Sequence, residues 1–345
     1  MKPYNRFWKP RHLIWLLVLP FLFGVLRSLP VGEIWAALSN LRIWQVLLLV
    51  GINLGILLLF SSRWWLILRS KGYPLPYFSL VRYRLSAFGI SYFTPGPQFG
   101  GEPLQVYLLR ANHNLPISAA IASVTLDKLL ELLGNFTFIS AGLAVVISSG
   151  SLPGAAPFLA LFLSFALLAL PAGYLLILLF GGYPLKSAAH RFTHRLQHFF
   201  VAHPRAQTGI KALTNAEVQI GQFCRQQPFV LIQATLLSLL TWILVIAEYR
   251  LTLYFLGQPV DWMAAISLLT AARIAFLLPV PGGLGTLETS QVLAMQALGF
   301  NPALGISVSL LVRARDLLLA GFGLWLGAYL TQRKPVYPLP SQAGD

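Results

Sequence analysis

Charged side chains stand inside stretches of this chain that are otherwise apolar. The candidates to bind a ligand are Arg84, Asp127, Glu131, Arg273, Arg313 and Asp316. A charge at the middle of a bilayer costs roughly 2.5–3.5 kcal/mol on insertion scales, so each should face the interior of a helix bundle. There these groups could bind a charged head group, or they could form an ion-pair network that fixes the register of the helices. The two roles are not exclusive.

Two breaks rich in proline and glycine interrupt apolar sequence, and each ends in a glutamate. The first break, Thr94–Glu102, contains Gln98, Gly100 and Gly101, and the second break, Leu278–Glu288, contains Gly282, Gly283 and Gly285. Proline has no N–H group to donate and clustered glycines do not hold a helix, so neither break is expected to be helical. At membrane depth such backbone survives only where it is buried in protein or lines a watered cavity.

Each break is expected to point backbone N–H groups and the positive end of the next helix toward the membrane interior. This arrangement suits the phosphate or carboxylate of a lipid head group. Thr286 is expected to cap the helix after the second break, and Pro103 to open the helix after the first. The alternative is that Glu102 and Glu288 satisfy their own helix ends and that nothing binds there.

The two breaks have matching surroundings. Asp127 follows Glu102 by 25 residues, and Arg313 follows Glu288 by the same 25 residues. The spacing indicates an internal duplication, with repeat halves at roughly residues 79–150 and 261–331. Interrupted apolar segments at corresponding places in two halves are typical of a transport site. The matching placement also predicts that Asp127 and Arg313 pair across the centre of the bundle.

The composition places the chain in a membrane. Of its 345 residues 57% are hydrophobic and 10% are charged, whereas a soluble domain carries about 25% charged residues. The formal charge of +15 comes from lysines and arginines in short segments between apolar runs, as in cytoplasmic loops, so no nucleic-acid partner is expected. The single cysteine, Cys224, excludes a disulfide within the chain.

The predicted fold is an all-α polytopic membrane protein with about six transmembrane helices and two opposed re-entrant helix–loop–helix hairpins that form an inverted repeat. The expected spans are Leu13–Leu26, Val46–Leu68, Ile117–Ile147, Phe158–Phe180, Phe229–Leu256 and Ala303–Leu330. Residues 1–334 are expected to form a single bundle, and residues 335–345 a disordered tail. If each hairpin enters and leaves the membrane on one side, the basic segments and both termini fall in the cytoplasm.

The segment 185–225 is polar and basic and has helical periodicity. Its apolar residues recur at a spacing of four and three, opposite lysine, arginine and histidine, which is typical of a helix lying on anionic lipid. His190, His194 and His198 share a face, but no carboxylate or cysteine stands among them, so a metal site is not expected. No phosphate-binding loop or nucleophile motif is found, and no cofactor is expected.

Three motifs carry a resemblance to a known family. Pro97–Leu109, Asp127–Leu132 and Pro281–Gly285 resemble the lysylphosphatidylglycerol synthase transmembrane region family, also called the UPF0104 or flippase-like family. The resemblance extends over roughly residues 11–333. In the bifunctional synthases this region is the lipid flippase and a soluble aminoacyl-transfer domain follows it. The resemblance therefore implies a stand-alone member without that domain, and Gln105 and Asp127-Lys128 stand where relatives often have Arg and Glu-Arg.

These observations predict a lipid translocase of a prokaryotic plasma membrane. Its partners would be membrane lipids, namely an anionic or aminoacylated phospholipid or a lipid-linked sugar, with the head group held between the two hairpins. The first alternative is an accessory or scaffold subunit for a separate synthase or glycosyltransferase. The second is a membrane-embedded lipid transferase, which the lack of a nucleophile–base pair disfavours.

Overall fold

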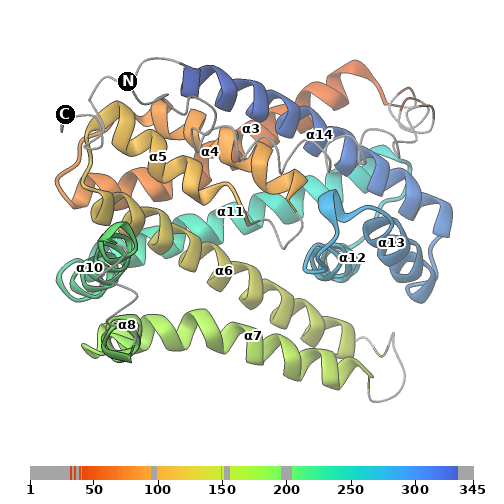
Figure 1. Cartoon of the computed structure of the whole chain (residues 1–345). Coiled ribbons are helices and arrows are strands. Elements are labelled where there is room, and N and C mark those ends of the chain that lie inside the picture. Colours follow the sequence, from red (N-terminus) through yellow and green to blue (C-terminus); the bar gives the residue numbers. More distant parts are fainter. Residues whose placement is uncertain are drawn as a thin grey trace. The chain divides into compact units, whose positions relative to one another are not determined.

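The computed structural model is helical throughout the part of the chain that it describes, which is residues 32, 35, 39, 41–94, 99–148, 150, 156–195 and 204–332. Within those ranges it has eleven α-helices and no strand (Figure 1). The helices are α3 Ile43–Ser70, α4 Tyr77–Phe93, α5 Glu102–His113, α6 Ile117–Ser148, α7 Ala156–Leu179, α8 Pro184–Arg195, α10 Pro204–Gln226, α11 Pro228–Phe255, α12 Trp262–Ala275, α13 Thr286–Ala297 and α14 Pro302–Gln332, with the 3-10 turn η1 Pro281–Gly283 before α13.

Four helices are long and apolar enough to cross a membrane: α3, α6, the part of α7 from Phe158 to Leu179, and α11. They correspond to four of the six expected spans. Helix α14 has 31 residues, roughly 46 Å at the helical rise of 1.5 Å per residue, but it carries Arg313, Arg315 and Asp316 along its length. The expected first span, Leu13–Leu26, and the expected tail, 335–345, lie outside the described residues.

The two predicted breaks separate short helices. Helices α4 and α5 have 17 and 12 residues, and helices α12 and α13 have 14 and 12, all fewer than the roughly 20 that span a bilayer. In the second break Gly282, Gly283 and Gly285 have φ angles of +59°, +63° and +75°. Only glycine adopts this left-handed backbone freely, so the glycines are what allow the chain to turn between α12 and α13.

Residue contacts divide the chain into two compact units. Unit 1 consists of residues 1–51, 82–104 and 248–334, and unit 2 of residues 52–81, 105–247 and 335–345. Helices α3, α4, α5 and α11 each contribute residues to both units. The second break belongs to unit 1 together with α12, α13 and α14.

Unit 1 is packed through glycines. A Cβ atom on Gly323 of α14 would lie 2.1 Å from the carbonyl oxygen of Leu85 in α4, and a Cβ on Gly89 would lie 2.6 Å from the backbone nitrogen of Leu324. A Cβ on Gly305 would lie 2.7 Å from the backbone of Gln291, where α13 packs on α14. Small residues at helix crossings let backbones approach closely, which is how helices associate in lipid.

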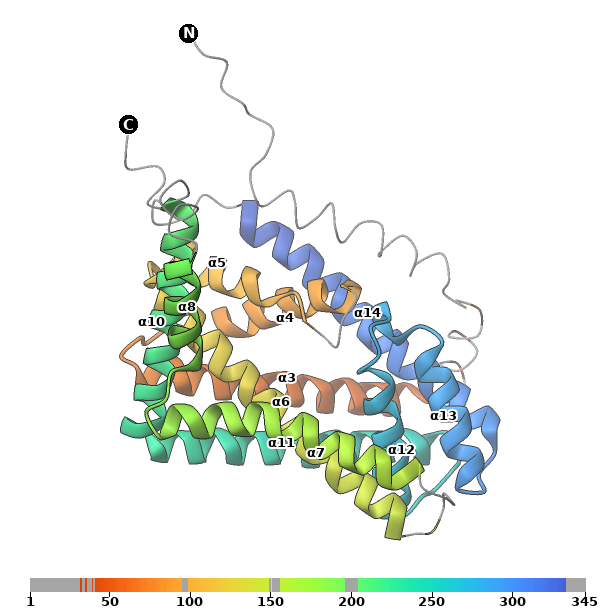
Figure 2. The same cartoon turned by 60° about the horizontal axis from the view of Figure 1, so that its bottom comes forward.

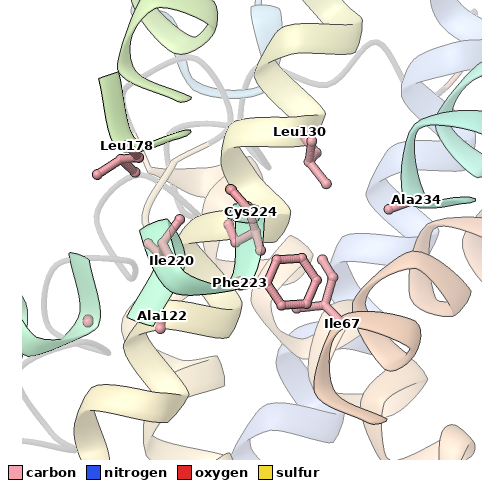
Figure 3. Packing of buried hydrophobic residues seen from close by; sticks show 10 residues of the cluster. Ile67, Ala122, Leu130, Leu178, Ile220, Phe223, Cys224 and Ala234 are labelled. Atoms are coloured by element: carbon pink, nitrogen blue, oxygen red, sulfur yellow. The ribbon is translucent and has the colours of Figure 1, made fainter. Parts of the chain in front are cut away.

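Unit 2 is built on the hairpin of α6 and α7, which lie side by side in both views (Figures 1 and 2). Helix α10 packs against both of them and against α8. The buried cluster at this junction is shown in Figure 3 and consists of Ile67, Ala122, Leu126, Leu130, Leu178, Ala216, Ile220, Phe223, Cys224 and Ala234. Helix α10 is therefore part of the packed core of this unit.

The basic segment 185–225 forms α8 and α10, as its periodicity predicted. Glu217 of α10 is 1% exposed and accepts hydrogen bonds from the backbone nitrogens of Leu185, at 2.8 Å, and Lys186, at 2.7 Å. The hydroxyl of Tyr174 donates to the same carboxylate at 2.9 Å. This glutamate thus caps the start of α8 from a neighbouring helix, whereas the sequence interpretation had treated the whole segment as a lipid-facing surface.

Candidate functional site

Arg313 of α14 connects the turn η1 of the second break with the start of α13 in unit 1. Its side chain is 2% exposed, and its Nη2 forms an ion pair with Glu288 in the first turn of α13. The same nitrogen donates to the carbonyl oxygen of Gly283 at 3.4 Å. Because Gly283 belongs to η1 and Glu288 to α13, a single guanidinium holds both sides of the turn.

The ion pair between Arg313 and Glu288 is incomplete. Among the described residues, neither Nε of Arg313 nor Oε2 of Glu288 has a hydrogen-bond partner, and both atoms are buried. A buried polar atom left without a partner costs about 1–3 kcal/mol, and arginine–carboxylate pairs commonly use two parallel hydrogen bonds. The pair therefore keeps one unused donor and one unused acceptor for groups brought by a ligand.

A second group of charges lies on the same helix. The guanidinium of Arg315 contacts Glu248 of α11 at 3.2 Å and Asp316 at 2.9 Å. The two carboxylate side chains are 9% and 11% exposed. One cation facing two buried carboxylates leaves this group with a formal charge of one negative unit. The Arg313–Glu288 pair therefore shares α14 with a cluster of three side chains that has one excess negative charge.

Neutral groups complete the surroundings of the break. The phenol of Tyr92 in α4 lies against Gly282, because a Cβ built on that glycine would be 3.0 Å from Cζ of the ring. The hydroxyl of Tyr249 in α11 donates to the side-chain amide of Gln291, which is fully buried in α13. The amide nitrogen of Gln291 donates in turn to the carbonyl of Leu268 at 3.0 Å. These bonds tie α11, α12 and α13 together beside the break.

The first turn of α13 has no side-chain cap. Its N-cap is Gly285, and Thr286 is the first helical residue. The hydroxyl of Thr286 donates to the carbonyl oxygens of Gly283, at 3.1 Å, and Ala275, at 3.4 Å. The prediction that Thr286 caps the helix is therefore wrong. The positive end of α13 keeps its backbone donors, as an anion site requires.

The backbone of the first break, where the structure describes it, is bonded by Glu102 and by Ser91 of α4. Oε2 of Glu102 accepts from the backbone nitrogen of Gly100 at 2.8 Å, and Oγ of Ser91 accepts from that of Gly101 at 3.0 Å. A Cβ on Gly101 would lie 2.1 Å from the carbonyl oxygen of Ala87, so the loop packs directly on α4. Glu102 thus serves its own helix end, which was the alternative interpretation. Gln98 lies outside the described residues.

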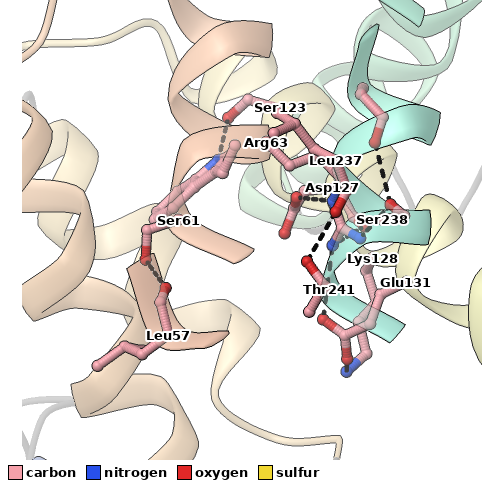
Figure 4. Close-up of polar contacts among 12 residues, drawn as sticks. Leu57, Ser61, Arg63, Ser123, Asp127, Lys128, Glu131, Leu237, Ser238 and Thr241 are labelled. Atoms are coloured by element: carbon pink, nitrogen blue, oxygen red, sulfur yellow. Dashed lines mark hydrogen bonds and ion pairs between the residues drawn. The ribbon is translucent and has the colours of Figure 1, made fainter. Parts of the chain in front are cut away.

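Asp127 and Glu131 belong to a buried ion-pair network in unit 2 (Figure 4). Nε of Arg63 donates to Oδ1 of Asp127 at 2.7 Å, its Nη2 donates to the carbonyl of the same residue at 3.0 Å, and its Nη1 donates to Ser238 at 3.0 Å. Glu131 lies 3.8 Å from the guanidinium and accepts from Lys128 at 2.8 Å. Two acids and two bases neutralise one another, so this network supports the structural interpretation of these charges.

Arg63 is the partner of Asp127 that the sequence alone did not identify. Its side chain is 1% exposed. A cation within the apolar run of α3 was a signal in the sequence, but Arg69 of the same helix carries the same signal, so it could not identify the partner of Asp127. Asp127 and Arg313 each have a partner of opposite charge within their own unit.

The remaining predicted residues, Arg84 and Arg273, lie in unit 1. Arg84 is on α4 and Arg273 is in the last turn of α12, and both are engaged by neighbouring groups. The structure therefore gathers Arg84, Arg273, Glu288, Arg313 and Asp316 in one unit with the second break. Among the described residues no set of three histidine, cysteine or acidic side chains could hold a metal ion.

Comparisons with known proteins agree on one family. The family model described as the lysylphosphatidylglycerol synthase TM region matches residues 12–323. A UPF0104 membrane protein of Methanothermobacter thermautotrophicus is 22% identical over 302 residues, covering 82% of this chain and 84% of the relative. A UPF0104 membrane protein of Methanocaldococcus jannaschii is 22% identical over 306 residues, covering 86% and 88%. The matched range includes both breaks and all the charged residues discussed above.

Proposed function

Because the chain belongs to the lysylphosphatidylglycerol synthase transmembrane region family, we propose that it binds a lipid by its charged head group and moves that lipid between the leaflets of the membrane. Membership of the family and the four long apolar helices support its place in a membrane. The lipid-transport step is the proposal. It locates the head group at the second break, between η1, α13 and α14.

The observation that carries the proposal is the incomplete pair of Arg313 and Glu288. A guanidinium with an unused buried nitrogen lies beside an uncapped helix end and a glycine turn. A phosphate can accept from both sources of N–H groups at once. The unused oxygen of Glu288 can accept from an ammonium or hydroxyl group of the same head. An anionic, zwitterionic or aminoacylated phospholipid, or a lipid-linked sugar phosphate, has this combination of groups.

In this proposal the pairs α4–α5 and α12–α13 are re-entrant hairpins that enter the membrane from opposite faces. Their helices are too short to cross a hydrocarbon core of about 30 Å singly. The first hairpin opens toward the cytoplasm and the second toward the outside, because this arrangement keeps the basic segment 185–225 in the cytoplasm. The chain then lies in a prokaryotic plasma membrane with both termini in the cytoplasm.

Reconstituted liposomes test the proposal. The purified protein would be incorporated into vesicles that contain fluorescent phosphatidylglycerol, and an impermeant quencher would report the rate at which the lipid changes leaflet. We expect that rate to exceed the rate in protein-free vesicles. Chemical modification of the lipid without any partner would instead indicate a transferase. A folded protein with neither activity would indicate an accessory subunit and would contradict the proposal.

A further inference from the structure

We propose that Glu288 takes up a proton when a phosphate-bearing head group binds Arg313, so that the anion and the proton enter the site together. The inference rests on the proposed function, because it requires an anionic head group at this arginine. It adds a coupling mechanism, in which lipid binding depends on the proton concentration.

The first step is competition for the guanidinium. Nη2 of Arg313 is occupied by Glu288, and Nε has no partner among the described residues. A phosphate diester has two free oxygens, and its strongest contact with arginine uses two adjacent nitrogens in parallel. Nη2 has two hydrogens, which are directed at Glu288 and at the carbonyl oxygen of Gly283. In the proposed complex the phosphate takes the N–H groups of Nε and Nη2, and Glu288 is displaced. The first-turn nitrogens of α13 add further donors to the phosphate.

Displacement of Glu288 by the phosphate changes the charge of the site. Before binding, Arg313 and Glu288 neutralise each other, while Glu248, Arg315 and Asp316 together carry one negative charge. The phosphate adds a second negative charge. A displaced Glu288, whose side chain is only 25% exposed, would then be an unpaired carboxylate beside other anions. Burial and like charges both favour the protonated carboxyl group.

The proton step is balanced without any other reactant. One proton from water forms an O–H bond on a carboxylate oxygen of Glu288, and no other covalent bond changes. The neutral carboxyl group then has a hydrogen to donate, and a phosphate oxygen is an acceptor within the same site. Anion and proton together restore the formal charge that the site had before binding.

The choice of Glu288 over the other acids follows from their partners. Glu248 and Asp316 share Arg315, so neither loses its only cation when Arg313 turns to the phosphate. Two phenols lie beside the site: Tyr92, in electrostatic range of Glu288, Arg313, Arg315 and Asp316, and Tyr249, which donates to Gln291 of α13. The same unit also contains the arginines Arg84 and Arg273. Both phenols are neutral and both arginines are engaged by neighbours, so Glu288 is the acid left without a partner.

Calorimetry on the full-length protein in detergent tests the inference. Dihexanoylphosphatidylglycerol, a soluble anionic phospholipid, would be titrated at pH 7 in two buffers that differ in ionisation enthalpy, which gives the number of protons bound. Wild type should take up about one proton per lipid. Glu288→Gln should bind the lipid with an uptake near zero. Asp261→Asn, a control that removes an exposed acid at the N-cap of α12, should keep the wild-type uptake, and dihexanoylglycerol, which lacks phosphate, should cause none.

A second measurement needs no variant. Over the pH range in which binding takes up one proton, the affinity of wild type for dihexanoylphosphatidylglycerol should fall about tenfold for each rise of one pH unit, as linkage requires. Binding without proton uptake and with constant affinity across pH would overturn the inference and leave the proposed function standing. Equal uptake by Glu288→Gln would also overturn it. Failure of the folded wild type to bind this lipid would overturn both proposals.

Discussion

Two buried arginines have opposite hydrogen-bond environments in this protein. Arg63 contacts two carboxylates, a carbonyl oxygen and a hydroxyl, and Arg313 keeps a nitrogen without a partner among the described residues. A satisfied ion pair fixes helices, whereas an unsatisfied one is expected where a ligand completes it. The residue types and the spacing of Arg313 and Glu288 were sufficient to predict from the sequence that the second break is a candidate site.

The partner of Asp127 could not be predicted, because it lies 64 positions away in the chain on another helix.

Loss of Arg63 should destabilise the protein strongly. Arg63→Gln leaves Asp127 buried without its cation, and breaking one partner of a buried pair typically costs about 3–5 kcal/mol. Thermal unfolding in detergent should show a lower Tm for Arg63→Gln and partial recovery in Arg63→Gln/Asp127→Asn. Lys211→Gln, which removes an exposed charge on α10, should leave Tm unchanged. A double variant no more stable than Arg63→Gln would contradict the structural role of the pair.

Lys71 should make stability depend on pH. The amine of Lys71 lies 5.6 Å from the ring centre of Phe223 and donates to the carbonyl of Gln219. Burial there lowers the pKa of Lys71 from 10.5 to about 8. Between these pH values the unfolded chain binds more protons than the folded one, so this contribution to stability rises with pH. The Tm of wild type minus the Tm of Lys71→Met should therefore increase as pH rises from 7.5 to 9.5.

The Lys71 comparison requires a Cys224→Ser background. Burial raises the pKa of the Cys224 thiol, so the folded protein keeps the thiol proton to a higher pH than the unfolded chain does. The contribution of the thiol to stability therefore falls as pH rises. Removing the thiol from both proteins isolates the amine. A Tm difference that stays constant across the pH range would show that Lys71 titrates alike in the folded and unfolded states.

At the scale of the helices, hydropathy and breaker residues are sufficient to locate the elements. The apolar runs predicted α3, α6, α7 and α11, and the proline–glycine breaks separated α4 from α5 and α12 from α13. Periodicity could not show that Glu217 caps α8 from another helix, since that contact depends on a tertiary crossing. It also could not show which helices cross at glycines, because a glycine inside an apolar run has the same local signal wherever it faces.

The crossing of α4 and α14 predicts a sharp difference between two neighbouring glycines. Gly323→Val should disrupt unit 1, because even a Cβ atom would lie 2.1 Å from the carbonyl oxygen of Leu85. Gly321→Val, on the same helix, should be tolerated, because no atom lies within 4 Å of the Cβ position there. Yield of monodisperse protein and Tm would report the difference. Equal behaviour of the two variants would contradict the crossing.

At the scale of the whole molecule, the matching spacing of the two halves conceals a chemical difference. The first break uses Glu102 to bind its own backbone, and the second leaves an uncapped helix and an unfinished ion pair. The matching spacing predicts that the two breaks are equivalent sites. Spacing cannot distinguish them, because their hydrogen bonds depend on the side chain that each loop contacts, which is Ser91 at the first break and Arg313 at the second.

The inverted arrangement of the two breaks predicts their accessibility. In a Cys224→Ser background, a cysteine at Gln98 should react with an impermeant thiol reagent from the cytoplasmic side, and a cysteine at Thr286 from the outer side. The reason is that the hairpins enter the membrane from opposite faces in the proposed topology. Right-side-out and inside-out vesicles give the two readings. Labelling of both positions from one side would contradict the inverted repeat.

The most direct test of the central claim is the rate of lipid movement in vesicles that contain Glu288→Gln/Arg313→Gln. This double variant removes both charges, so neither is left stranded and the fold should survive. We predict that it retains the wild-type Tm and moves fluorescent phosphatidylglycerol no faster than protein-free vesicles, while Lys211→Gln moves it at the wild-type rate. Movement by the double variant at the wild-type rate would show that the lipid head group does not use this site.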